Sequence, residues 1–400
     1  MLNLAFFVSA ALLVMFVITV TNVAIFPRLQ ASVRLVTGKD QAAETIASIP
    51  HAAFPKVSVL IPARNEANHI EHAISSLLAQ TYPNYEIRVL DDHSDDNTYT
   101  IANAAANGDP RLSIFAGAAL PVDWMGKNWA CQQLAQLAQG EILIFTDADV
   151  RWQPVAISAL VAELQRTQAD LLTVWPRQIT QSWGERLVVP LGVFAVLAYL
   201  PIYLAHNGPW PLAAAANGQC MVFRRHAYQQ CGGHAGVRST VLEDVRLAQS
   251  IKAVGLRLRL ANGANLLQAR MYEDWQTTRN GYAKNILAGY GNSRLFLALS
   301  TIFHLTVFVG PWLWLILGWL EQNSSGWPLW PLALILLGLS MRGLTALATR
   351  QRLLDALFMP ISALLMTRIA AHAVWWQWRY GGPQWKGRTV HETPISVEDF

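Results

Sequence analysis

The stretch Glu141-Ile142-Leu143-Ile144-Phe145-Thr146-Asp147-Ala148-Asp149 joins a continuous apolar run to two carboxylates that stand one residue apart. A short apolar run of this kind is typical of a buried strand, and ligands of open α/β sheets bind beyond the carboxyl ends of the strands. Two carboxylates at such an end suit Mg²⁺ or Mn²⁺, shared with a substrate diphosphate. Taken alone, the pair also fits a turn or a helix cap, so its companions elsewhere in the chain decide.

Other short apolar runs, at residues 57–61, 86–90 and 112–115, also have the composition of strands. Apolar residues at helical spacing separate them, for example at 70–78 and 128–139. Strands that alternate with helices predict an α/β domain with a mainly parallel, Rossmann-like sheet. Neither the G-x-G-x-x-G fingerprint nor the P-loop occurs, so a nucleotide would be held in another way.

Carboxylates follow three of the expected strands. They are Glu66, the pair Asp91-Asp92, and the pair Asp147 and Asp149. The carboxyl ends of parallel strands share one edge of a sheet, so we expect these groups to converge there. One carboxylate could accept a hydrogen bond from a uracil ring or a ribose hydroxyl while another holds the metal. Separate helix caps are the alternative interpretation. Lys127 is either a cation for the diphosphate or an ordinary solvated lysine.

The composition, 53% apolar and 14% charged, is that of a membrane protein. Residues 1–27 carry no charge and are long enough for a transmembrane anchor, and 295–320 and 327–341 are two further candidate spans. Segment 353–378 is interrupted by charges and proline, so an interfacial or re-entrant helix is favoured over a third late span. We expect the uncharged segment 187–204 to face the membrane and receive an apolar acceptor, with a buried helix as the alternative.

Basic residues follow the first and third candidate spans, which places the central domain in the cytoplasm and the chain in the inner or plasma membrane. We attribute the net charge of +4 partly to lipid headgroup contacts and expect no nucleic-acid partner. The three cysteines lack metal-ligand spacing and are expected to be reduced thiols. The expected domains are a linker at 28–54, a catalytic domain at 55–290 and a tail at 379–400.

Four motifs occur in a fixed order, and together they resemble family 2 glycosyltransferases of the GT-A fold over residues 55–290. They are Pro62-Ala63-Arg64-Asn65-Glu66-Ala67, Asp91-Asp92, Thr146-Asp147-Ala148-Asp149 and Glu243-Asp244. Gly126-Lys127-Asn128-Trp129-Ala130-Cys131 and Gly232-Gly233-His234 resemble the branch that glycosylates carotenoids and related isoprenoid lipids. The anchor and the late spans also resemble ceramide glucosyltransferases.

The resemblance implies a role for each matching position. Pro62, Ala63 and Glu66 would line the uridine pocket, and Asp91 or Asp92 would contact the base. Asp147 would face the ribose or the metal, and Asp149 would bind the metal, Mg²⁺ or Mn²⁺.

Further implied roles lie later in the chain. Asp244 would be the catalytic base, Gly218 and Gln219 would lie near the donor sugar, and Glu243 would support them. Since consecutive residues point in different directions, we expect Glu243 and Asp244 to diverge. Asp244 could also serve as a helix N-cap. A diphosphate-binding arginine would come from Arg279, in a Gln-x-x-Arg motif with Asn in place of Trp, or from Arg388.

The resulting hypothesis is an inverting transferase that moves a sugar, glucose by resemblance, from a UDP-sugar to a membrane lipid. A carotenoid, another isoprenoid lipid, a sphingolipid or a glycerolipid would be the acceptor. One alternative is a processive polysaccharide synthase, which needs a channel of several helices. The other is a non-catalytic membrane scaffold that binds nucleotide sugar, which would not need Asp149 or Asp244.

Overall fold

The computed structural model describes residues 2–30, 54–320, 326–385 and 388–389, so most of the expected linker and tail lies outside the described residues. The chain divides into two compact units. The helical unit comprises residues 1–26, 180–203 and 272–391, and the sheet unit comprises 27–179, 204–271 and 392–400. Each is described by itself.

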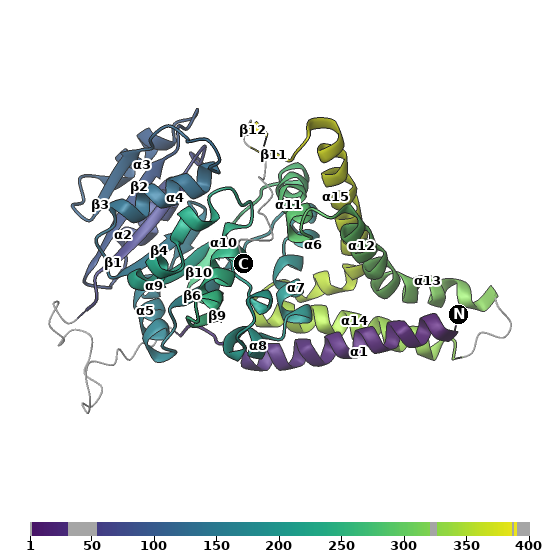
Figure 1. Cartoon of the computed structure of the whole chain (residues 1–400). Coiled ribbons are helices and arrows are strands. Elements are labelled where there is room, and N and C mark those ends of the chain that lie inside the picture. The colour runs from purple at the N-terminus through teal and green to yellow at the C-terminus, as the bar shows by residue number, and fades with distance from the viewer. Residues whose placement is uncertain (1, 31–53, 321–325, 386–387, 390–400) are drawn as a thin grey trace, which may run out of the picture. The chain divides into compact units, whose positions relative to one another are not determined.

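A seven-stranded sheet forms the centre of the sheet unit, in the order β3-β2-β1-β4-β8-β6-β9 (Figure 1). Only β8 runs antiparallel to its neighbours, β4 and β6, and the other pairs are parallel, which confirms the predicted mainly parallel sheet of the GT-A fold. The strands are β1 (Val57–Ala63), β2 (Tyr85–Asp91), β3 (Leu112–Ala116), β4 (Ile142–Thr146), β6 (Leu171–Trp175), β8 (Cys220–Arg224) and β9 (Leu258–Asn262).

Helices connect these strands, and a small second sheet follows the acidic turn. The helices are α2 (Ile70–Leu78), α3 (Thr98–Ala106), α4 (Gly126–Leu137), α5 (Ala156–Arg166), α8 (Ile202–Asn207), η3 (Pro211–Ala213), α9 (Arg225–Gln230), η4 (Gly233–Val237) and α10 (Glu243–Ala253). In the small sheet, β10 (Leu267–Ala269) pairs with β5 (Val150–Trp152) and β7 (Arg177–Gln178). Helix α4 begins two residues before the predicted 128, so Lys127 lies in its first turn.

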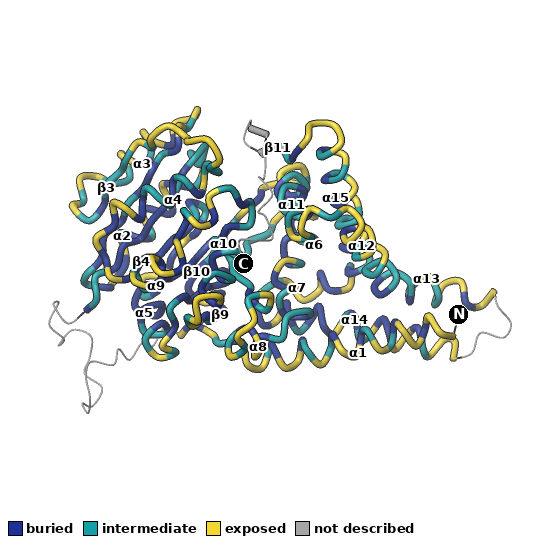
Figure 2. Tube along the Cα trace, viewed as in Figure 1, coloured by how far each residue is buried: buried dark blue, intermediate teal, exposed yellow. Residues whose placement is uncertain are grey.

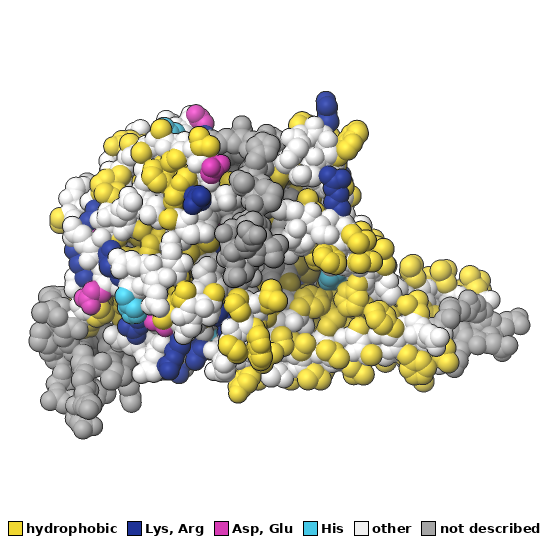
Figure 3. Space-filling model, viewed as in Figure 1, with side chains coloured by type: hydrophobic (Ala, Val, Ile, Leu, Met, Phe, Trp, Pro, Cys, Tyr) yellow, Lys and Arg dark blue, Asp and Glu magenta, His cyan; other side chains and the backbone are white. Residues whose placement is uncertain are grey.

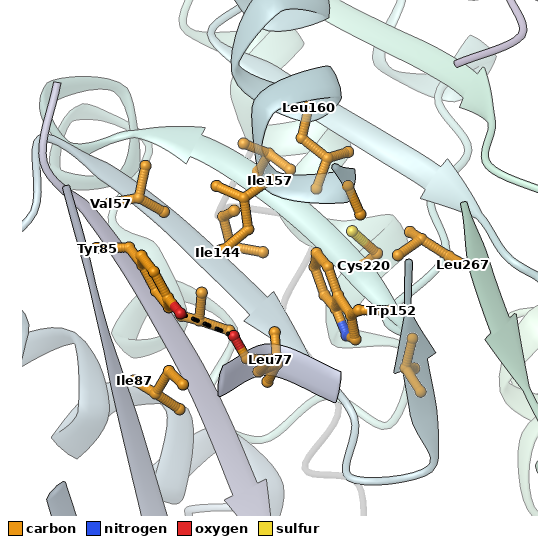
Figure 4. Packing of buried hydrophobic residues seen from close by; sticks show 14 of the residues in the cluster. Val57, Leu77, Tyr85, Ile87, Ile144, Trp152, Ile157, Leu160, Cys220 and Leu267 are labelled. Atoms are coloured by element: carbon orange, nitrogen blue, oxygen red, sulfur yellow. Dashed lines mark hydrogen bonds between the residues drawn. The ribbon is translucent and has the colours of Figure 1, made fainter. Parts of the chain in front are cut away.

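The core of the sheet unit fixes where the strands end. Ile144 of β4 and Ile157 and Leu160 of α5 are fully buried, and they pack beside Trp152 and Cys220 (Figure 4). The hydroxyl of Tyr85 donates a 3.0 Å hydrogen bond to the carbonyl of Leu77, which ties β2 to α2. Each fully buried aliphatic side chain contributes about 1.5–3 kcal/mol. These contacts pack β2 and β4 against α2 and α5.

The helical unit is built on α1 (Leu2–Ile25), which packs on α7 (Leu191–Tyr199) and α14 (Leu329–Ala348). The other helices are α6 (Trp183–Val188), α11 (Trp275–Gly289), α12 (Arg294–Phe308), α13 (Gly310–Leu317), η5 (Gly318–Leu320), η6 (Leu353–Phe358) and α15 (Met359–Tyr380). The short strands β11 (Gln384–Trp385) and β12 (Arg388–Thr389) pair with each other. Asn22 donates to the carbonyls of Leu197 and Leu200 and accepts from the amide of Ile202, so the end of α1 is fixed to α7.

Three helical segments are long and apolar enough to cross a membrane: Leu2–Ile25, Leu329–Ala348 and Leu353–Tyr380. The expected span at 295–320 is a pair of helices, α12 and α13, with a bend of 42° between them. Pro311 lies at the start of α13, where it cannot donate a backbone hydrogen bond. Counting the bent pair as one span gives up to four. Many apolar side chains along α1 are exposed, as lipid contact requires (Figures 2 and 3).

Segment 187–204, expected to face the membrane, forms the end of α6, α7 and the start of α8. Phe194 and Ala198 are buried in a cluster with Leu12 of α1 and Met341 of α14. Gly192, Ala195, Tyr203 and Leu204 are exposed. The alternative, a buried helix, therefore describes the inner face of α7, while a few other residues of the segment remain on the surface.

Candidate active site

The acidic turn at 147–149 connects β4 to β5 at the carboxyl end of the central sheet. The buried Thr146 donates a 2.9 Å hydrogen bond to the carbonyl of Gln219, which fixes the turn against the residues before β8. In the part of the chain that the structure describes, Oδ1 of Asp149 is buried and has no hydrogen-bond partner. Burial, followed by the charges of Asp147 and Glu66, raises the pKa of Asp149 well above its ordinary value. The Glu66 turn and the turn at 147–149 are two of the three predicted acidic turns, and both place negative charge near the carboxylate of Asp149.

The turn after β1 is held to the turn after β2 by side chains. The amide of Glu66 donates to the hydroxyl of Thr98 at 2.8 Å, and the amide of Asn65, at φ +52°, donates to the hydroxyl of Ser94. Asp91 in turn accepts hydrogen bonds from both the amide and the hydroxyl of Ser94. The acidic turn of Asp91 and Asp92 therefore lies beside the Glu66 turn, on the same edge of the sheet.

The remaining predicted nucleotide-pocket residues lie at the ends of the same two strands. In the parallel register of β1 and β2, Pro62 is opposite Leu90 and Ala63 is opposite Asp91. Asp92 is almost completely buried, and its carbonyl accepts a 2.7 Å hydrogen bond from Arg64. Asp91, which is only half-buried, is therefore the more accessible of the two carboxylates that we expected to contact a base.

Lys127 connects the acidic turn to the start of α10. Its Nζ lies 2.9 Å from Oδ1 of Asp147 and 2.9 Å from Oε1 of Glu243. Although burial lowers the pKa of Lys127, the charges of Asp147 and Glu243 outweigh it and raise that pKa well above its ordinary value. The side chain is 40% exposed, so the ammonium is both paired and open to solvent. Lys127 is therefore paired with two carboxylates, unlike an ordinary solvated lysine.

Asp244 is held by two backbone amides. Its Oδ2 accepts from the amide of Gly218 at 2.9 Å, and its Oδ1 accepts from the amide of Val245 at 2.8 Å. Leu242 is the residue before α10, so Asp244 lies in the first turn and is not the N-cap. Burial and the neighbouring Glu243 raise the pKa of Asp244 to about 6, against the lowering effects of Lys127 and the two amides. A carboxylate in this environment is a better proton acceptor than an exposed one.

Gly218 lies where these groups meet. A Cβ added to it would lie 3.2 Å from Nζ of Lys127 and 3.5 Å from both Oε1 of Glu243 and Oδ2 of Asp244. We expected Glu243 and Asp244 to diverge, but both carboxylates reach the same glycine. Both residues lie in the first turn of α10, and the missing side chain of Gly218 leaves room for both carboxylates.

A buried amide network lies beside Gly218, and sequence reasoning missed most of it. The Oε1 atom of Gln219 accepts from the Nε2 of Gln178 at 2.6 Å, and the amide of Gln219 donates to Oδ1 of Asn217 at 3.0 Å. The amide of Asn217 donates to the hydroxyl of Thr173 on β6. No sequence spacing connects residues 173, 178 and 217, because β6, β7 and β8 come together only in the folded sheet.

The two candidate arginines belong to the helical unit. Arg279 lies in α11, where its guanidinium donates to Oδ1 of Asn280 at 3.1 Å. Arg388 lies in β12, which pairs with β11. Their assignment to the diphosphate stays a prediction.

The donor set fits a hard divalent cation. Within the described residues, no three His, Cys, Asp or Glu side chains are grouped as a complete protein-only metal site. Asp149 instead offers a buried oxygen without a hydrogen-bond partner, close to the negative charges of Asp147 and Glu66. A Mg²⁺- or Mn²⁺-like ion usually takes one or two carboxylates and completes its shell with water and substrate phosphate.

Comparisons with known proteins concern the family and the fold of this chain. Residues 58–232 match glycosyl transferase family 2. The 4,4'-diaponeurosporenoate glycosyltransferase of Staphylococcus aureus is 26% identical over 241 residues, which are 60% of this chain and 62% of that protein. The chain thus matches about three fifths of the length of this curated relative.

Among solved structures, a mannosyltransferase from Pyrobaculum calidifontis, in complex with GDP-mannose and Mn²⁺, superposes with a TM-score of 0.54. It is 19% identical, and the alignment covers 93% of this chain and 98% of that one. At this identity the similarity shows the fold alone. The matched segment 58–232 and the ordered motifs at one edge of a GT-A sheet therefore make the sheet unit similar to glycosyl transferase family 2.

Proposed function

We propose that the protein is an inverting, metal-dependent glycosyltransferase that moves a sugar from a nucleotide diphosphate donor to a membrane lipid. The observation that carries the proposal is the cluster in which Lys127 touches both Asp147 and Glu243 beside the amide-held Asp244. In this cluster the residues that would bind the diphosphate and the metal lie beside Asp244, the residue that would accept the proton. A scaffold that only binds a nucleotide sugar would not need Asp244 there.

The donor would bind at the carboxyl ends of β1, β2 and β4. Glu66 and Asp91 would meet the nucleoside, and Asp147 and Asp149 would hold the metal. The bound metal would supply Lewis-acid stabilisation of the diphosphate leaving group. Lys127 would add positive charge at the same place, since its ammonium is already held between Asp147 and Glu243.

The acceptor would lose its proton to Asp244. The amides of Gly218 and Val245 fix the orientation of this carboxylate, and burial with Glu243 raises its pKa toward neutrality. General-base catalysis of this kind contributes about 10²–10⁴-fold. Attack opposite the diphosphate would invert the anomeric centre.

The apolar helices support a lipid acceptor in the membrane. Three helical segments are suited to spanning a bilayer, and the S. aureus relative is named for a carotenoid carboxylate. We therefore propose a carotenoid or another isoprenoid lipid as acceptor, UDP-glucose as donor, and a sheet unit that faces the cytoplasm.

The test uses membranes that contain the full chain, incubated with radiolabelled UDP-glucose or GDP-mannose and then extracted with organic solvent. We expect label in the lipid phase from UDP-glucose, lost on chelation with EDTA and restored by Mn²⁺ or Mg²⁺. Label in insoluble polymer would instead establish a polysaccharide synthase. Asp149→Asn should abolish transfer, while Asp109→Asn, at a surface ion pair with Arg111, should leave it unchanged. Transfer that survives both EDTA and Asp149→Asn would refute the metal site.

A further inference from the structure

A second group of charges lies in the helical unit, among Arg186 of α6, Arg342 of α14 and Asp355 of η6. Asp355 is only 3% exposed and accepts hydrogen bonds from Nε and Nη2 of Arg186. The guanidinium of Arg186 also lies over the ring of Trp183, 4.2 Å from its centroid. Arg186 therefore occupies both oxygens of this carboxylate in a two-point ion pair.

Arg342 lies in the same cluster with fewer partners. It is 2% exposed, and its Nε and Nη1 atoms are buried without a hydrogen-bond partner among the described residues. Asp355 and Tyr282 are near enough to interact with it electrostatically. The hydroxyl of Tyr282, however, donates to the carbonyl of Val189 and so does not satisfy the guanidinium.

The charge balance of this cluster is positive. Two guanidinium groups face one carboxylate, so the group carries one excess positive charge within an apolar helical unit. Buried ions are stabilised when they are paired and their donors are satisfied, and arginines within membrane helices commonly mark functional sites. The cluster therefore has the charge and the donors to take one more anion.

We propose that Arg342 binds the oxyanion of an amphiphilic lipid, a phosphate or a carboxylate, in the helical unit. The guanidinium presents N–H groups in a planar fork that matches the oxygens of both groups. Nε and Nη1 belong to different edges of this fork, so ligand oxygens can approach from either edge. Asp355 does not compete for these donors, because Arg186 already holds it.

A lipid source follows from where the cluster lies. Arg342 belongs to α14, and Asp355 belongs to the segment Leu353–Tyr380, two of the segments suited to crossing a membrane. An anion that reaches Arg342 along these helices would carry an apolar chain. The proposal concerns binding within the helical unit, and it stands or falls independently of sugar transfer.

The experiment measures binding to the purified full chain in neutral detergent by native mass spectrometry. The probes are dioleoyl phosphatidic acid, oleate, dioleoylglycerol as the uncharged lipid, and inorganic phosphate. We expect the two anionic lipids to bind at least tenfold more tightly than dioleoylglycerol. Arg342→Gln should weaken them about tenfold to a hundredfold, the effect of losing charge-assisted hydrogen bonds to a buried group.

Arg352→Gln is the matched control, since it removes the same charge from an exposed position at the start of η6 and should leave binding unchanged. Asp355→Asn should tighten binding of the anionic lipids, because it increases the excess positive charge. This second variant keeps the proposal testable if Arg342→Gln does not fold.

Three results would overturn the proposal. The first is equal binding of phosphatidic acid and dioleoylglycerol to the unaltered chain. The second is equal weakening by Arg352→Gln and Arg342→Gln, which would indicate general surface attraction. The third is binding of inorganic phosphate as tight as that of the lipids, which would assign the cluster to free phosphate.

Discussion

Asp244→Asn is the substitution that tests the proposed chemistry most directly. The two oxygens of Asp244 accept from the amides of Gly218 and Val245 at 2.9 and 2.8 Å. Asparagine has a single acceptor oxygen, so one amide would face an NH₂ group. A buried donor left without a partner costs about 1–3 kcal/mol of folding stability. Loss of the negative charge beside Glu243 offsets part of this cost, and we expect the variant to fold.

The effect on catalysis should be larger than the effect on folding. Removal of a general base lowers kcat by about 10²–10⁴-fold, or about 2.7–5.5 kcal/mol in activation free energy. Because Asp244 contacts backbone amides next to the donor sites, we expect the KM for the nucleotide sugar to stay within about threefold of the parent value.

The assay is initial-rate transfer of radiolabel into extracted lipid, with donor concentration varied. Thermal unfolding with and without UDP shows whether the variant still binds nucleotide, since a ligand that binds the folded state raises the midpoint. Asp109→Asn provides the matched control, because Asp109 forms an ion pair with Arg111 at the surface. A kcat within threefold of the parent, with UDP stabilisation intact, would refute the assignment of Asp244 as the base.

Four further predictions concern the same unit. Because the pKa of Asp244 is raised to about 6 and the base acts when deprotonated, kcat/KM should rise with pH through about 6 and then level off. Glu243→Gln should move this rise in kcat/KM to lower pH, because it removes a negative charge beside Asp244. A rise at the same pH as in the parent would contradict the electrostatic interaction between Glu243 and Asp244. Lys127→Met should lower kcat about 10²–10³-fold by removing a cation at the diphosphate, measured by the same transfer assay; a loss under tenfold would make its role structural. Gly140→Ala would place a Cβ 2.5 Å from a backbone nitrogen of β1 and should destabilise the fold by about 1–3 kcal/mol or more, whereas Gly236→Ala, whose nearest contact is 3.7 Å, should leave the melting temperature nearly unchanged.

The sequence was sufficient to predict the sheet and the edge where the site lies. The apolar runs before Glu66, Asp91 and Asp147 became β1, β2 and β4, neighbours in one parallel sheet. Parallel strands have their carboxyl ends on one edge of the sheet, so the predicted parallel order already implied that the carboxylates converge. Local apolar runs also indicated helix α1 and the late helices that are long and apolar enough to cross a membrane.

The sequence did not predict the polar contacts that join distant segments. Glu243 and Asp244 were expected to diverge, but both reach Gly218, because β8 runs antiparallel between β4 and β6 and brings that glycine to the start of α10. The network of Gln178, Asn217 and Gln219 depends on the same strand order.

By itself, then, the sequence determined which residues carry charge and at which strand end each of them lies, because hydrophobic periodicity is a local property of the chain. The pairing of Lys127 with both Asp147 and Glu243, and the excess positive charge around Arg342, were decided only by tertiary structure. Electrostatic partners are selected by distance in space and by burial, and neither quantity is encoded in the spacing of residues along the chain.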